Sequence, residues 1–215
     1  MDDITHKLST AFRSKRLLFR AVDSGNPADL ALITSALFDP ISQGLTDLVR
    51  LQPIPQSTGM KMMAHAAESA LLAVFICLAP DDSELESDSP GARFKEAEAK
   101  ATPIGSLALT QHPLPKTEHL RYARLALGIS EPFQGKGFGK EAVNWALDWA
   151  FDYAGLNRVE LGVASFNVRA VELYGKLGFT CEGRRRETVF VAGRWYDEVE
   201  FGMLQREWKG LRGRA

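Results

Sequence analysis

The residues best suited to chemistry form a glycine-rich turn, QGKGFG, at Gln134 to Gly139. Residues 124–129 before it are rich in large apolar side chains, and apolar residues between 142 and 150 recur at helical spacing after it. A turn from a strand into a helix leaves backbone N–H groups unpaired at the positive end of the helix dipole. Such a turn is a suitable place to bind phosphate, and Lys136 and Lys140 add positive charge there.

The spacing of the glycines separates three phosphate-binding patterns. A P-loop requires Ser or Thr after its Gly-Lys pair, but Glu141 follows Lys140. The dinucleotide fingerprint G-x-G-x-x-G is met only with Ala142 in its last position, so an NAD-binding oxidoreductase remains an incomplete match. The third pattern, Q/R-x-x-G-x-G/A, is met in full by Gln134, Gly137 and Gly139.

A second block, residues 167–179, combines a helix start, an apolar helix face and a helix end. Asn167 follows an apolar strand pattern over 159–164 and is suited to cap the next helix. Gly178 provides the left-handed residue that ends many helices. The apolar face of the helix comprises Ala170, Leu173, Tyr174 and Leu177.

In this order, the two blocks resemble the GNAT (Gcn5-related) N-acetyltransferase superfamily. The first is similar to its coenzyme A signature, and the second to its N-x-x-A-x-x-x-Y-x-x-x-G-F pattern. The resemblance is strongest over 125–179. The closing segment, 193–208, is similar to the branch that contains ribosomal-protein N-terminal acetyltransferases, which also includes polyamine and antibiotic acetyltransferases.

The resemblance implies an α/β fold with a mixed, mostly antiparallel central sheet of six to seven strands and helices on both faces. We expect a single domain of this kind over residues 1–215. A charged insertion at 81–101 interrupts the apolar patterns, and we expect its first half to be a mobile loop. The patterns predict strands at 16–22, 71–78, 103–110, 119–129, 159–164, 182–190 and 195–204, and helices at 26–38, 60–69, 138–153 and 168–177.

The resemblance also implies acetyl-CoA as co-substrate, without a metal. The backbone of Leu127 and Ile129 is expected to contact the pantetheine and acetyl groups, with a bulge at Gly128 that frees a backbone N–H. Asn167 either hydrogen-bonds the pantetheine arm or only caps its helix. The pyrophosphate is expected to bind the turn, through Gln134, Gly135, Lys136, Gly137, Phe138, Gly139 and Lys140.

Transfer of an acetyl group to an amine needs an acid for the leaving thiolate and a way to deprotonate the amine. Tyr174 matches the family's tyrosine acid, although a tyrosine on an apolar helix face is also a common core residue. Candidate bases are Glu118, His119 and Glu160, which lie in or near the expected central strands. A chain of water molecules is the alternative, because an α-amine with a pKa near 8 needs little help.

The predicted function is an acetyl-CoA-dependent N-acetyltransferase that acts by direct attack in a ternary complex. The acceptor is a primary amine, either a protein N-terminus or a small amine, and the protein is a monomer or a homodimer. The alternative is a non-catalytic acyl-CoA-binding sensor or interaction module on the same fold.

The composition agrees with an ordinary globular protein: 215 residues, 45% hydrophobic, 25% charged, with a net charge of −1. It favours neither nucleic-acid nor membrane binding, and the four histidines show no metal-ligand spacing. The N-terminal residues are acidic and lack the apolar region of a secretory signal peptide. We therefore expect a cytoplasmic protein in which Cys77 and Cys181 are reduced, mostly buried thiols.

Overall fold

The computed structural model describes residues 3–22, 29, 32, 41, 52–53, 55–87, 89–111 and 117–213. Within these residues the chain forms a seven-stranded sheet in the order β1-β2-β3-β4-β5-β7-β6. Neighbouring strands are antiparallel except β4 and β5, which are parallel, as the mixed sheet predicted from the sequence requires. The strands are β1 (Leu17–Ala21), β2 (Leu72–Leu78), β3 (Thr102–Thr110), β4 (Tyr122–Ile129), β5 (Arg158–Ala164), β6 (Thr180–Val191) and β7 (Arg194–Leu204).

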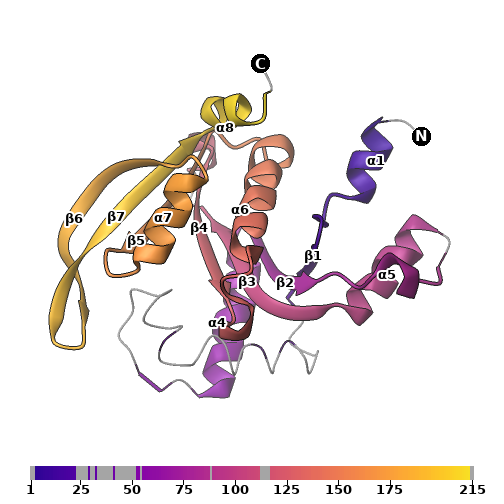
Figure 1. The fold of residues 1–215 in the computed structure, drawn as a ribbon, viewed down its shortest axis with the longest axis horizontal. Helices are drawn as coiled ribbons and strands as arrows, with labels where there is room; N and C mark the ends of the chain where they lie inside the picture. The colour runs from indigo at the N-terminus through magenta and orange to yellow at the C-terminus, as the bar shows by residue number, and fades with distance from the viewer. Residues whose placement is uncertain are drawn as a thin grey trace.

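Helices cover both faces of this sheet (Figure 1). Helices α6 and α7 pack on one face and share its hydrophobic core. A second, smaller core lies on the other face of β1 and β2, under α5. No helix in the described part of the chain is long and apolar enough to cross a membrane. The helices are α1 (Asp3–Ser9), α4 (Gln56–Ser69), α5 (Pro90–Lys100), α6 (Phe138–Asp148), α7 (Val168–Lys176) and α8 (Gln205–Leu211).

Strand β1 shows why two cores form, because successive side chains of a strand point to opposite faces. Leu17 and Phe19 face the α6 side, where Phe19 stacks on Trp145 with ring centroids 3.6 Å apart. Leu18 lies in the second core with Phe75 of β2. Full burial of such side chains contributes about 1.5–3 kcal/mol each, so the strand is held from both sides.

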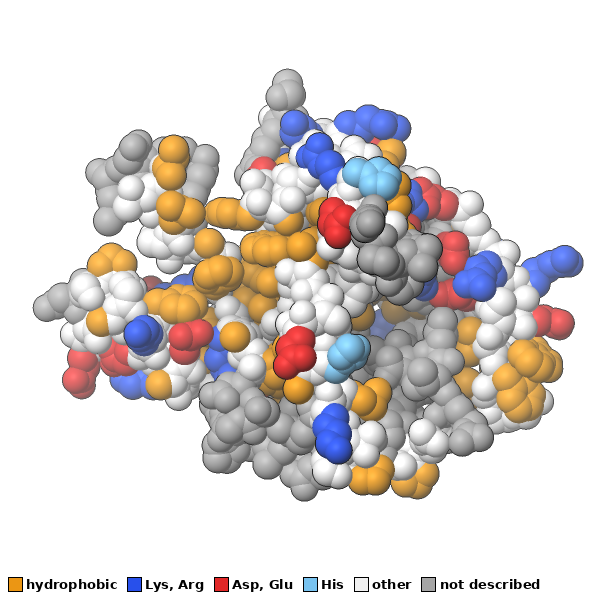
Figure 2. Space-filling model, turned by 180° about the vertical axis from the view of Figure 1, so that it is seen from behind, with side chains coloured by type: hydrophobic (Ala, Val, Ile, Leu, Met, Phe, Trp, Pro, Cys, Tyr) orange, Lys and Arg blue, Asp and Glu red, His pale blue; other side chains and the backbone are white. Residues whose placement is uncertain are grey.

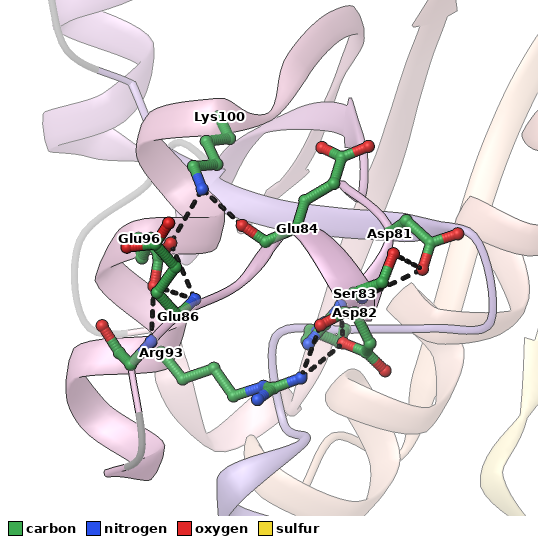
Figure 3. Close-up of polar contacts among 10 residues, drawn as sticks. Asp81, Asp82, Ser83, Glu84, Glu86, Arg93, Glu96 and Lys100 are labelled. Atoms are coloured by element: carbon green, nitrogen blue, oxygen red, sulfur yellow. Dashed lines mark hydrogen bonds and ion pairs between the residues drawn. The ribbon is translucent and has the colours of Figure 1, made fainter.

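The charged insertion at 81–101 contains α5, which the sequence analysis did not predict (Figure 3). Ser89 caps the helix by accepting a hydrogen bond from the Ala92 N–H at 3.3 Å, and Pro90 occupies the first turn. Lys100 first, and then the N–H groups of residues 86 and 87, lower the pKa of Glu96 to about 2. Buried Ala97 attaches the helix to the second core. Mobility of the first half of the insertion stays a prediction.

The other predicted strands and helices of the described chain agree with the structure to within four residues. The predicted helix at 26–38 lies outside the described residues, apart from positions 29 and 32. Both cysteines are free: Cys77 is buried, whereas Cys181 is exposed, which corrects the expectation that both thiols are mostly buried. Burial raises the pKa of Cys77 to about 11.

Helix α1 and the residues directly after it leave several hydrophobic side chains in contact with solvent. Ile4, Leu8 and Phe12 are all exposed. Seen from behind, the molecule is indented between α1 and α5, and hydrophobic side chains are visible there (Figure 2). The Trp145 indole N–H donates to the Ala11 carbonyl at 2.8 Å, which attaches this segment to α6.

The pairing of β4 with β5 is unusually short and determines the shape of the site. It extends only from Tyr122–Arg158 to Arg124–Glu160. Beyond these residues β4 continues along β3 to Ile129, and β5 continues along β7 to Ala164. The edges that β4 and β5 turn toward each other therefore remain unpaired, and they form a gap in the centre of the sheet.

An ion pair between a buried carboxylate and partly exposed arginines crosses β5 beside this gap. Arg124 of β4 lies 2.7 Å from the carboxylate of Glu198 on β7, and Arg185 of β6 contacts the same carboxylate at 3.1 Å. The pair passes over Gly162 of β5, where a Cβ would collide with both Glu198 Oε1 and Arg124 Nη2. A larger residue at this position would force the Arg124 and Glu198 side chains apart.

We predict that Gly162→Ala destabilises the protein by about 1–2 kcal/mol, because its Cβ displaces Arg124 from the buried Glu198, which keeps Arg185 as a partner. Urea unfolding followed by circular dichroism measures this change. Gly183→Ala in β6 is the control, since its Cβ would meet no atom within 4 Å. Equal stability of the two variants would contradict a role for Gly162 in this ion pair.

Candidate active site

The glycine-rich turn connects the end of β4 to α6, and its conformation is specific to glycine at two positions. Gly135 and Gly137 have φ values of +76° and +83°, in the left-handed region. After Gln134, the first backbone N–H that bonds back into the described chain is that of Glu141, which donates to the Gly137 carbonyl at 3.1 Å. The N–H groups from Gly135 to Lys140 therefore remain available, and this fits an anionic group at the helix start.

Gln134 has a different role from the one predicted. Its N–H donates to the Glu131 carbonyl at 3.1 Å, which closes a short 3-10 turn and removes this donor from the coenzyme site. Its side-chain amide donates to the Ile129 carbonyl at 2.9 Å. Gln134 thus connects the turn to the last residue of β4, and the expectation that its backbone N–H binds pyrophosphate is corrected.

The backbone of β4 alternates between its two edges. The Ser130 N–H donates to Ile104 of the β3 segment, whereas the Arg121 carbonyl accepts from Asn157 before β5. Odd-numbered residues therefore present their backbone groups toward β5. Leu127 and Ile129, which were predicted to contact pantetheine and the acetyl group, accordingly face the unpaired gap.

The bulge predicted at Gly128 is absent from the β3–β4 ladder. The register runs without a shift, with Gly128 opposite Ser106. Its carbonyl lies so close to Gly105 that a Cβ on Gly105 would collide with it. The N–H groups of β4 are freed because β5 departs from the strand, so no bulge is required.

Tyr174 of α7 is buried over β5 and β7. Its ring is in edge contact with Phe179 and tilted against Phe201, at centroid distances of 5.6 and 6.2 Å. Its hydroxyl has no hydrogen-bond partner among the described residues. Burial raises the pKa of Tyr174 to about 12, so the phenol is protonated at neutral pH and is able to donate a hydrogen bond.

Asn167 caps α7, which is one of the two roles that the sequence analysis considered for it. Its side-chain oxygen accepts from the Ala170 N–H at 3.2 Å. This bond fixes the start of α7 and thereby the direction of Tyr174, two turns further along. A contact between Asn167 and the pantetheine arm stays a prediction.

The three candidate bases are not gathered at the gap. Glu118 and His119 lie in a 3-10 turn before β4, while Leu127 lies five residues, about 17 Å, beyond the start of that strand. Glu160 is in the paired part of β5 and is bound to Arg158 at 3.1 Å. Glu118 and His119 thus precede the end of β4 that is opposite the turn, and a role for any of the three as base stays a prediction.

Two arginines beside the turn were not singled out in the sequence. Arg16, just before β1, donates to the Lys136 carbonyl at 3.1 Å, and Arg169 of α7 lies beside Gly135. Arg169 belongs to the second sequence block, residues 167–179, and this position could have indicated that it lies near the site. Arg16 carried no such signal, because 120 residues separate it from Lys136.

Other kinds of site are not formed by the described residues. Within them, no three His, Cys, Asp or Glu side chains are grouped so that they could hold a metal ion. The sheet is parallel at one pair of strands only, unlike the parallel sheets that bind dinucleotides. The geometry therefore favours the coenzyme A pattern over the dinucleotide pattern.

Comparison with known proteins gives partial matches to curated acetyltransferases. The chain is 38% identical over 88 residues to a spermidine N(1)-acetyltransferase of Vibrio cholerae, which is 41% of this chain and 51% of that protein. It is 33% identical over 90 residues to the putative ribosomal N-acetyltransferase YdaF of Bacillus subtilis, covering 42% and 49%. The chain thus spans about half the length of the curated relatives it matches.

The fold is similar over nearly the whole chain to a solved structure. This is the spermidine N-acetyltransferase of Vibrio cholerae in complex with CoA and spermine, with a TM-score of 0.69 and 23% identity. The match covers 91% of this chain and 99% of the other. The sequence pattern of one family matches residues 61–179, which include the turn, the gap and Tyr174. The chain belongs to the acetyltransferase (GNAT) family.

Proposed function

We propose that this protein is an acetyl-CoA-dependent N-acetyltransferase that acts on a primary amine. The observation that supports this most directly is the gap between β4 and β5. The turn with its unpaired N–H groups stands at one end of the gap, and the buried Tyr174 lies beside it over β5. Each of these parts corresponds to one requirement of acyl transfer from a thioester.

Acetyl-CoA would supply the acetyl group as an activated thioester. The N–H groups from Gly135 to Lys140 would hold its pyrophosphate, and the β4 edge at Leu127 and Ile129 would bind the pantetheine arm and the carbonyl oxygen. The protonated Tyr174 hydroxyl would donate to the leaving sulfur. No covalent step is needed, because the amine attacks directly in a ternary complex.

The cysteines give no support to a covalent acyl-enzyme. Cys77 is buried in the second core, on the sheet face opposite α6 and α7, and its raised pKa keeps the thiol protonated at neutral pH. Cys181 is the second residue of β6, the strand at the outer edge of the sheet. Neither thiol is in a position to attack a thioester in the gap.

The acceptor is either a small amine or a protein N-terminus. The names of the relatives include both spermidine and ribosomal acetyltransferases, so they support amine acetylation in general. The two acceptors differ in basicity. An α-amine with a pKa near 8 is partly neutral at physiological pH, whereas an alkylamine with a pKa near 10 must lose a proton first. An acetylation screen with spermidine and an N-terminal peptide distinguishes these acceptors.

A non-catalytic acyl-CoA-binding module is the second candidate. The same turn and gap would serve it, because binding requires only the phosphate and pantetheine contacts. The Tyr174 hydroxyl makes no hydrogen bond within the described chain, so it is available to donate to the leaving sulfur, which catalysis requires and a sensor does not. The two candidates therefore differ in what Tyr174 does.

We predict that Tyr174→Phe lowers kcat about 100-fold or more and leaves the Kd for acetyl-CoA unchanged. The ring and its packing remain, and only the proton donor is lost. Thiol release with an active amine measures kcat, and calorimetry measures the Kd. The control is Tyr153→Phe at the end of the α6 region, where the ring is exposed.

Three results would contradict parts of this proposal. A folded protein that does not bind acetyl-CoA would remove the coenzyme site itself. Binding without turnover of any amine would support the sensor. Full activity of Tyr174→Phe would exclude the phenol as the acid and leave the coenzyme site intact.

We also predict that Tyr174 ionises near pH 12, about two pH units above an ordinary tyrosine, because its ring is buried. The difference in phenolate absorbance between the wild type and Tyr174→Phe during an alkaline titration measures this pKa. The folded pKa is above the unfolded one. Its contribution to stability is therefore complete below pH 10 and is lost as the pH rises toward 12. A midpoint near pH 10 would show that the phenol is solvated.

A further inference from the structure

Positive charge gathers around the glycine-rich turn beyond what the family patterns specify. Arg16 approaches from β1, Arg169 from α7, and Lys136 and Lys140 belong to the turn and the first turn of α6. The first turn of α6 adds the positive end of its dipole. Among the described residues, Glu141 is the one carboxylate that pairs with any of these four cations.

Arg16 is already engaged, and it holds the turn in place. Its Nε is 2.7 Å from the Glu141 carboxylate, which also accepts from the Arg16 N–H at 2.7 Å and the Ser14 hydroxyl at 2.8 Å. Burial acts to raise the pKa of Glu141, but these hydrogen bonds outweigh it and lower the pKa. The guanidinium also lies over the Phe138 ring at 4.5 Å. These contacts hold Arg16 in a fixed position, so it forms a wall of the site on the β1 side of the turn.

Arg169 on the opposite side has no such engagement. Within the described chain its guanidinium makes no ion pair or hydrogen bond, yet it lies against the turn: a Cβ on Gly135 would be 2.7 Å from its Nη2. It is the second residue of α7, where the helix dipole disfavours a cation. Its guanidinium is therefore free to pair with an anion beside the turn, and an anion there would offset the unfavourable dipole.

We infer that Arg169 binds the pyrophosphate of coenzyme A from the α7 side, opposite the wall that Arg16 forms. This inference rests on the proposed function. The planar guanidinium is suited to two phosphate oxygens at once, and Gly135 leaves the space that a side chain would occupy. The phosphate would thus be held between two helix starts, those of α6 and α7.

The test is calorimetric titration of Arg169→Gln with CoA and with 3′-dephospho-CoA. We expect the Kd to rise about 10- to 100-fold for both ligands, because one charge-assisted contact to the pyrophosphate is lost. Arg169→Lys keeps the charge but loses the planar guanidinium with its two parallel donors. Its Kd should lie between those of Arg169→Gln and the wild type. The matched control is Arg194→Gln in the β6–β7 turn region, which is exposed and far along the chain from the site.

The outcomes separate this inference from the proposed function. If the wild type binds CoA and Arg169→Gln binds it equally well, Arg169 does not contact the coenzyme and the inference is overturned. A loss for CoA but not for 3′-dephospho-CoA would place Arg169 at the 3′-phosphate and overturn the pyrophosphate assignment. Since Arg169 is exposed and unpaired in the described chain, the thermal unfolding midpoint of Arg169→Gln should equal that of the wild type. A lower midpoint would contradict its freedom from structural contacts.

Discussion

The parallel contact between β4 and β5 is limited to three residue pairs, and the rest of the site depends on this limit. If the two strands paired along their full length, the backbone of Leu127 and Ile129 would be used within the sheet. Because β5 stays with β7 while β4 stays with β3, the chain leaves unpaired backbone groups in its own centre. Apart from the Ile129 carbonyl, which accepts from Gln134, these groups are available to the coenzyme that we propose for this site.

The side chains around the gap control its width from the face opposite α6 and α7. Arg124 reaches Glu198 across β5, and Arg185 holds the same carboxylate from β6. The carboxylate of this pair is buried while both arginines are partly exposed, and the desolvation of Glu198 offsets much of the attraction, so the main consequence of the pair is geometric. Four strands are joined at one point through Gly162, which lacks the side chain that would prevent the crossing. The position of β4 relative to β5 therefore depends on residues far from the glycine-rich turn in sequence.

Sequence reasoning predicted the sheet and the turn because both leave local patterns. Apolar periodicity identified the strands, and the left-handed Gly135 and Gly137 fell where the motif placed glycine. Contacts between distant residues have no local pattern. The Arg16–Glu141 pair joins residues 125 positions apart, and the sequence does not show which side chains meet at the gap, so Glu118 and His119 were chosen only for their position beside the strand. Helix α5 was missed because most of its residues are charged or exposed and its buried side gives only a weak apolar pattern.

The outer strand β6 carries a further consequence of the same sheet order. Its twelve residues are almost entirely exposed, and within the described chain it pairs with β7 alone. The unpaired backbone edge of a strand of this length can pair with a strand of a second chain. Register shifts at residues 181–183 and 185–189 interrupt its hydrogen-bonding edge, and Arg184 to Arg186 place three like charges along it. Irregularity and charge of this kind are features that disfavour edge-to-edge pairing, and within the described residues no further strand pairs with this edge.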